Sequence, residues 1–290
     1  MIDNDFAERP GYVLGHSDAE LKRLMRQGAF YADLTEDVLR RAGLCPGTRV
    51  LDIGCGAGDV SLLAARLVGP SGLVVGVDRS EQAIALARAR VDRAGFSWVR
   101  FVVAELETFV CNETFDALIG RFVLLYLSDP ATRLRALARH LRSGGIVAFQ
   151  EMDMHFAHSV PEAPLFRQCL HWIINVFEKA RFEPDMGSRL FATYLCAGLP
   201  APRMIATGRL EGGPDSPAYE YLAETVRSLI PMIERFDVAT AAEIGIETLA
   251  ARLREEAVAG NRCIFPPLLI GAWSRWHLPE TEANGGAAPA

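Results

Sequence analysis

The sequence is short of lysine: Lys22 and Lys179 stand among 30 lysine and arginine residues, and the formal net charge is −6. A broad basic surface for nucleic acid or anionic lipid is therefore not expected. No apolar run approaches the roughly 20 residues of a membrane-spanning helix. The first residues, MIDNDFAERP, are polar and acidic, unlike a secretory signal. These absences predict a cytoplasmic protein with neither nucleic-acid nor membrane partners.

Paired cysteines are also missing. The six cysteines are scattered and no two of them form a CxxC pair, which disfavours a structural zinc site or a thioredoxin-like redox motif. Most of them lie in apolar stretches, so we expect them to be reduced and buried. No internal repeat is visible, and half of the 290 residues are hydrophobic, enough for one large domain with an insertion.

Apolar runs alternate with helical patterns along the first half of the chain. Five runs are predicted strands: 49–53, 73–77, 99–103, 115–119 and 146–149. They are almost continuously apolar, which is typical of parallel strands covered by helices on both faces. Before them, Ser17 and Glu20 have the spacing of a capping box and predict helices that run to about Ala42. After them come helical segments within 160–198, a strand at 203–210, helices at 217–236 and 240–258, and a last strand at 263–273.

The segment VLDIGCGAG at 50–58 is the most informative stretch, because an apolar strand runs through three glycines into a helix. In a doubly wound sheet this first turn faces the ligand crevice. The nicotinamide fingerprint G-x-G-x-x-G/A, read from Gly54, would place Asp59 at its sixth position. Asp59 and the nearby Asp52 would repel a pyrophosphate. Acidic residues suit a cation, and S-adenosyl-L-methionine carries a sulfonium and an ammonium but no phosphate.

Two further acids follow the next strands. Asp78 ends the second strand, where a carboxylate can bind both hydroxyls of a ribose. Glu105 follows the third strand and is placed to accept a hydrogen bond from an adenine amino group, while the Leu106 amide can donate to the ring.

The ordered series DIGCGAG, VVGVD, VVAEL, FDALIGRFVLLYLSDP and LRSGGIVAFQE resembles the motifs of class I S-adenosylmethionine-dependent methyltransferases over residues 48–150. The resemblance is greatest to the small-molecule branch that includes quinone-biosynthesis methyltransferases. It implies an α/β fold, a doubly wound Rossmann-like seven-stranded sheet whose last strand is antiparallel, with N-terminal helices and a helical cap.

The resemblance also implies roles for individual residues. Relatives usually have Gly-Asp where this chain has Ala104-Glu105, so the adenine contact is a departure from their pattern. The peptide at 12–17 resembles the lid segment of some relatives. The implied cofactor-binding residues are Asp52, Gly54, Cys55 and Gly56 at the methionine end, Asp78 and Arg79 at the ribose, Ala104, Glu105 and Leu106 at the adenine, Arg121 at the methionine amino group or carboxylate, and Tyr12 in the lid.

A cluster of ionisable residues, QEMDMHFAH at 150–158, follows the fifth strand. In an extended segment Glu151, Asp153 and His155 would point to one side. His155 is our first candidate for a general base and Glu151 the second. A metal site and a solvated loop are the two alternatives for this cluster; our prediction contains no metal.

The sequence thus predicts transfer of a methyl group to an oxygen, nitrogen or carbon atom of a small, partly apolar metabolite, and a homodimer is the assembly we consider. The alternatives are a cyclase or isomerase that binds the same cofactor without methylating, a binding protein with a decayed site, and a nucleotide-dependent oxidoreductase. The predicted organisation is an N-terminal helical lid at 1–45, a cofactor-binding core at 46–155, a helical insertion at 156–200, strands and cap helices at 201–278 that complete the domain, and a disordered tail at 279–290.

Overall fold

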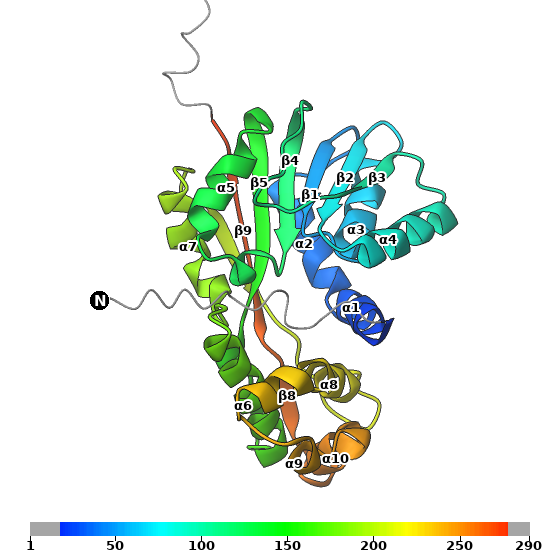
Figure 1. The fold of residues 1–290 in the computed structure, drawn as a ribbon, viewed down its shortest axis with the longest axis vertical. Coiled ribbons are helices and arrows are strands. Elements are labelled where there is room, and N and C mark those ends of the chain that lie inside the picture. The colour runs from blue at the N-terminus through cyan, green and yellow to red at the C-terminus, as the bar shows by residue number, and fades with distance from the viewer. Residues whose placement is uncertain (1–17, 278–290) are drawn as a thin grey trace, which may run out of the picture.

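The computed structural model describes residues 18–277 and is built on a seven-stranded sheet in the order β3-β2-β1-β4-β5-β9-β7 (Figure 1). Strand β9 runs antiparallel to both of its neighbours, β5 and β7, while the other pairs are parallel. The predicted sheet with an antiparallel last strand is therefore confirmed. The strands are β1 (Arg49–Ile53), β2 (Leu73–Asp78), β3 (Val99–Val103), β4 (Phe115–Arg121), β5 (Leu141–Asp153), β7 (Arg203–Thr207) and β9 (Leu268–Arg275).

Helices cover both faces of the sheet, as the continuous apolar strands predicted. Side chains of α2 (Ala32–Ala42) and α3 (Asp59–Val68) form one core with one face of the sheet, and α4 (Glu81–Ala94) packs beside them against β3. The opposite core is formed with α5 (Pro130–Ala138) and α7 (Met186–Cys196). Because the two cores hold β1 and β4 between them, the loops at the ends of these strands have a rigid base.

A second helical layer gathers below the sheet in Figure 1. Helix α8 (Ala218–Arg235) packs against α6 (Pro164–Lys179), α10 (Ile246–Ala259) and the N-terminal helix α1 (Asp18–Phe30). Helix α9 (Ala241–Ile244) and the two-stranded pair β6 (His158–Val160) and β8 (Cys263–Phe265) complete it. Over residues 18–277, no helix is both long and apolar enough to cross a membrane.

Several sequence predictions fail at this level. The last strand predicted at 263–273 is divided into β8, which pairs with β6, and β9, which belongs to the seven-stranded sheet. Strand β5 extends to Asp153, well beyond the predicted end at 149, because it pairs with β9 over eight positions up to Asp153 and Leu268. The cysteines are all free, but only Cys55 and Cys169 are buried; Cys45, Cys196 and Cys263 are exposed. Apolar flanking residues do not bury a cysteine that falls on the outer face of a helix or at a chain turn.

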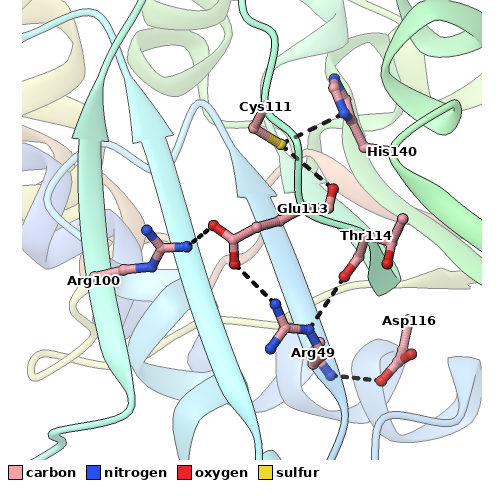
Figure 2. A network of polar contacts seen from close by, with 7 residues as sticks. All are labelled: Arg49, Arg100, Cys111, Glu113, Thr114, Asp116 and His140. Carbon is pink, nitrogen blue, oxygen red and sulfur yellow. Dashed lines mark hydrogen bonds and ion pairs between the residues drawn. The ribbon is translucent and has the colours of Figure 1, made fainter.

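The amino ends of the strands carry a polar network of their own (Figure 2). The Arg49 amide donates to Asp116 at 2.9 Å, and the Arg49 and Arg100 guanidinium groups both pair with Glu113. The hydrogen bond and charge of Arg100 are the main reason that the pKa of Glu113 is lowered. Cys111 lies 3.5 Å from Nδ1 of His140 in the same network. The network therefore lies at the amino ends of the parallel strands. Ligands of such sheets bind at the opposite end, beyond the carboxyl ends of the strands.

Candidate active site

The loop after β1 turns sharply on its glycines. Gly54, Gly56 and Gly58 have φ values of +60°, +51° and +81°, a region that other residues rarely adopt. A Cβ at Gly54 would lie 2.6 Å from Cγ2 of Val123, so the loop packs directly on the chain that leaves β4. Helix α3 then starts at Asp59 without a side-chain cap.

Asp78, at the end of β2, holds this loop from the neighbouring strand. Its Oδ2 accepts a hydrogen bond from the Gly56 amide at 2.9 Å, and its Oδ1 accepts one from the Ser80 amide at 2.9 Å. The Cys55 amide donates to the Val77 carbonyl at 3.0 Å. The glycine loop and the end of β2 therefore form one unit.

A cavity of about 410 Å³ opens between this unit and the helical layer. Its volume falls within the range of roughly 300–1,000 Å³ that is usual for small-molecule sites. We call the side formed by α1, the glycine loop and the ends of β2 and β3 the donor half; Asp59, Asp78, Glu105 and Glu107 lie there. We call the opposite side the acceptor half; it is lined by Leu125, Tyr126, Met152, Met154, Leu170, Ile173, Ile174, Phe177, Phe182, Tyr221, Leu222, Thr225 and Pro267.

Most of the predicted cofactor-binding residues meet in the donor half. Ala104 is half-buried but absent from the lining, and its amide bonds to the Asp78 carbonyl at 3.0 Å. Tyr12 lies outside the described residues. The predicted residues that line the cavity are Gly54, Cys55, Gly56, Asp78, Arg79, Glu105, Leu106 and Arg121.

Asp52 does not line the cavity, contrary to the sequence prediction of a ligand-facing carboxylate. Its side chain is 1% exposed and accepts a hydrogen bond from the Ser61 hydroxyl of α3 at 2.5 Å. Its other carboxylate oxygen is buried without a hydrogen-bond partner among the described residues. Burial raises the pKa of Asp52 to about 7, against the opposing effects of Ser61 and Arg121. The acid thus lies beneath the loop, where it shapes the local charge.

Arg121 ends β4 at the wall of the cavity. One of its guanidinium nitrogens donates to the Thr35 hydroxyl at 2.9 Å, and that hydroxyl lies 2.7 Å from Oε1 of Gln150. No described carboxylate is close enough to form an ion pair with Arg121. Burial lowers its pKa, while the negative charges of Asp59 and Asp52 oppose that shift. The geometry leaves a cation beside the cavity with guanidinium N–H groups for an anionic group of a ligand.

The two predicted bases lie outside the cavity lining. Glu151 is 0% exposed, and its Oε1 accepts hydrogen bonds from the Val123 and Leu124 amides, each at 2.9 Å. His155 is exposed and pairs with Asp185. The three ionisable groups do not share one side of an extended segment, because β5 ends at Asp153 and a 3₁₀ turn, η2 (Met154–Phe156), carries His155 away.

Asp153 is buried and accepts a hydrogen bond from the Ser188 hydroxyl. Burial is the main reason that its pKa is raised to about 6, and the neighbouring Asp185 adds to the shift. Within residues 18–277 no group of three or more His, Cys, Asp or Glu side chains is arranged to hold a metal ion.

Several lining residues were missed by the sequence analysis. Leu24 and Gln27 come from α1, Tyr221 and Thr225 from α8, and Met152 from the extended end of β5. The amphipathic pattern of α1 and α8 predicts a buried face, but not that part of this face borders a cavity. Of these residues, only Met152 was indicated by a local pattern, since the apolar run of β5 continues into Met152 and Met154.

Comparisons with known proteins agree with this geometry. Residues 44–184 match the model of a family described as "Methyltransferase domain". The chain is 36% identical over 127 residues to the 2-phytyl-1,4-naphtoquinone methyltransferase of Synechococcus elongatus, covering 42% of this chain and 51% of that protein. It is 35% identical over 119 residues to the ubiquinone biosynthesis O-methyltransferase of Aromatoleum aromaticum, covering 40% and 49%. The chain thus spans about half the length of the curated relatives it matches.

Solved structures share the fold over a longer stretch. The YcgJ protein of Bacillus subtilis superposes with a TM-score of 0.52 at 18% identity, covering 84% of this chain and 99% of that one. Coclaurine N-methyltransferase bound to N-methylheliamine and S-adenosylhomocysteine superposes with a TM-score of 0.50 at 15% identity, covering 84% and 72%.

Proposed function

We propose that this chain, whose residues 44–184 match the methyltransferase-domain family, transfers the methyl group of S-adenosyl-L-methionine to a small, uncharged and largely apolar metabolite. The observation that carries the proposal is the division of one cavity into a donor half lined by charged side chains of both signs and an apolar acceptor half.

The donor half suits this cofactor chemically. Asp78, Glu105 and Glu107 line it and favour a sulfonium and an ammonium, while Asp59 is paired with Arg90 at 2.7 Å. The guanidinium groups of Arg79 and Arg121 on the same lining suit the carboxylate of the methionine end. The backbone at Gly56 offers open space, since among residues 18–277 a Cβ there would meet only Leu24, at 4.0 Å. A nucleoside can therefore approach the loop closely.

We assign the contacts by chemistry. Asp78 would accept hydrogen bonds from the ribose hydroxyls with its remaining lone pairs, and Arg79 lies beside it. Glu105 and Leu106 would meet the adenine. Arg121 would bind the methionine carboxylate as a charge-assisted pair. Tyr12 stays a predicted lid residue, and the division into lid, core, insertion and cap also stays a prediction.

The acceptor half supports a flat apolar substrate. The rings of Tyr126 and Phe182 are 5.0 Å apart and nearly perpendicular, and Phe177 lies 6.0 Å from Phe182. Two relatives, a naphthoquinone methyltransferase and a ubiquinone biosynthesis O-methyltransferase, support a ring system of this kind. The cytoplasmic location and the homodimer stay predictions.

The cofactor supplies an electrophilic methyl group, so the chain's task is to align the acceptor atom and exclude water. The apolar walls of α6 and α8 would exclude water from the acceptor half. Tyr126, Tyr221 and Thr225 line the cavity and carry hydroxyl groups that would orient a polar atom of the acceptor. His155 and Glu151 are not assigned proton transfer, because neither lines the cavity.

Incubation with methyl-labelled cofactor and an extract of apolar metabolites tests the proposal. We expect one labelled product and an equal amount of S-adenosylhomocysteine, with both lost in Asp78→Ala. Conversion of a metabolite without release of S-adenosylhomocysteine would establish the cyclase or isomerase alternative instead. Absence of any change in the extract, together with no binding of the cofactor, would reject both.

A further inference from the structure

The chain that leaves β4 makes a strained corner at the junction of the two cavity halves. Phe122 has a φ of +57°, a left-handed conformation that is unfavourable for an aromatic residue. Arg121, Phe122 and Val123 line the cavity, and a 3₁₀ turn, η1 (Leu124–Tyr126), follows them. We call residues 121–126 the β4 corner.

Consecutive residues of β5 hold consecutive residues of the β4 corner. The Gln150 carbonyl accepts a hydrogen bond from the Phe122 amide at 3.0 Å. One oxygen of the Glu151 side chain accepts the next two amides, Val123 and Leu124, each at 2.9 Å. Oε2 of Glu151 is buried with no hydrogen-bond partner among the described residues. The fully buried carboxylate of Glu151 therefore accepts its two hydrogen bonds from backbone amides of the β4 corner.

The β4 corner connects the glycine loop, the acceptor half and the segment between α6 and α7. Val123 packs against Gly54, so it borders the glycine loop. Leu125 and Tyr126 line the acceptor half. The Leu125 carbonyl accepts a hydrogen bond from the Glu183 amide at 3.0 Å, which ties the segment between α6 and α7 to the corner. A shift of the corner would move donor and acceptor walls together.

We propose that Glu151 is a positioning residue: its carboxylate clamps the Val123 and Leu124 amides and so fixes the strained β4 corner between the glycine loop and the acceptor half. The residue acts through the corner, because its side chain does not line the cavity. The binding measurement that tests this inference rests on the proposed function, because it uses S-adenosylhomocysteine as the ligand. The exchange measurement does not.

The clamp depends on the charge of Glu151. Burial raises the pKa of its carboxyl group to about 7, against the hydrogen bonds of the corner amides. The titratable group that faces it from α7 is Tyr194, whose pKa is far above the neutral range, and Asp153 lies two residues along on β5. A protonated carboxyl group is a weaker acceptor than a carboxylate. The corner should therefore loosen as pH falls below 7.

The experiment compares four full-length proteins: wild type, Glu151→Gln, Glu151→Met and Asp153→Asn. Asp153→Asn is the matched control, because it alters another buried acid of the same strand that does not contact the β4 corner. Amide hydrogen exchange of Val123 and Leu124 is measured by NMR, and S-adenosylhomocysteine binding is measured by calorimetry between pH 6 and 8.5.

We expect Glu151→Met to weaken S-adenosylhomocysteine binding by about tenfold or more and to speed both exchange rates, because two buried amides lose their acceptor. Glu151→Gln keeps one acceptor oxygen, so it should rescue most of the affinity at pH 8. It should also lose less affinity between pH 8 and 6 than the wild type does, whereas Asp153→Asn should keep most of the wild-type loss. Asp52 titrates in the same range but is present in all four proteins, so it cancels in the comparison.

Two results would overturn the proposal. One is unchanged exchange and affinity in a folded Glu151→Met. The other is a pH profile of Glu151→Gln that matches the wild type, which decides the matter even where Glu151→Met does not fold. Failure of the wild type to bind S-adenosylhomocysteine would instead reject the proposed function, and the exchange rates of Val123 and Leu124 would still test the clamp.

Discussion

The carboxylate of Asp78 is bound to the backbone of Gly56 across two neighbouring strands, with 2.9 Å between Oδ2 and the amide nitrogen. The same side chain lines the cavity. Asp78 therefore has two roles: it holds the glycine loop in place, and it presents negative charge to a ligand. Loss of this group should affect binding more than folding.

Asp78→Ala should weaken S-adenosylhomocysteine binding by about 1–3 kcal/mol, because the ribose hydroxyls lose a charged acceptor and the Gly56 amide loses its partner. Calorimetric titration measures the change. Asp92→Ala, which removes an exposed acid in the last turn of α4, is the control and should leave the affinity unchanged. Equal affinities of Asp78→Ala and the wild type would refute the placement of the ribose.

Gly54→Ala should be far more harmful than Gly144→Ala. Both glycines have positive φ, +60° and +82°, so both substitutions carry a backbone cost of about 1–2 kcal/mol. A Cβ at Gly54 would also meet Val123 at 2.6 Å, whereas a Cβ at Gly144 would meet none of the described residues within 4 Å. Urea denaturation and S-adenosylhomocysteine titration of the two variants give the comparison. Equal losses would mean that the close packing of the loop on the β4 corner contributes nothing.

Asp52→Asn should make the stability less dependent on pH. The folded-state pKa of Asp52, about 7, lies above its unfolded value of 3.8, so its protonated form is favoured by folding. The contribution is fully present below the unfolded pKa and is lost as pH rises through about 7. Between pH 5 and 8 the wild type should lose roughly 2–3 kcal/mol more unfolding free energy than the variant.

Urea denaturation at both pH values measures this difference. Glu151 and Asp153 have raised pKa values too, but both are present in the two proteins and cancel. A parallel fall in the two proteins would show that Asp52 is ionised in the folded state throughout this range.

Ile173→Trp should block the acceptor half without disturbing the donor half. Ile173 is 5% exposed and lines the cavity from α6, so an indole there would occupy substrate volume. Methyl transfer should fall by about tenfold or more, since a displaced acceptor atom loses its alignment with the methyl group. Affinity for S-adenosylhomocysteine should not change. Val258→Trp, on the exposed side of α10, is the control; an active Ile173→Trp would place the acceptor elsewhere.

The fold and the donor half could be predicted from the sequence because their signals are local. A continuous apolar strand, three glycines and a strand-terminal acid fix the positions of Gly54, Gly56 and Asp78 within a parallel sheet. The direction of Asp52 could not be predicted in this way, since it depends on the Ser61 hydroxyl, which α3 places beneath the loop.

The residues of the acceptor half could not be predicted from local sequence patterns, because tertiary packing brings them together. The roles of Glu151 and His155 were mistaken because the length of β5 is set by its pairing with β9, far along the chain. That pairing keeps Glu151 inside the sheet, beneath the β4 corner, and leaves His155 in the turn beyond it. The contributions of α1 and α8 likewise follow from packing, since Gln27 and Tyr221, joined by a 3.2 Å hydrogen bond, are 194 residues apart.

A crystal structure of the full chain with S-adenosylhomocysteine tests the central claim most directly. We expect density for the nucleoside in the crevice between Gly56 and Asp78, with the ribose hydroxyls on the Asp78 carboxylate and the sulfur facing the acceptor half. Density for the adenosine anywhere else on the molecule would contradict it.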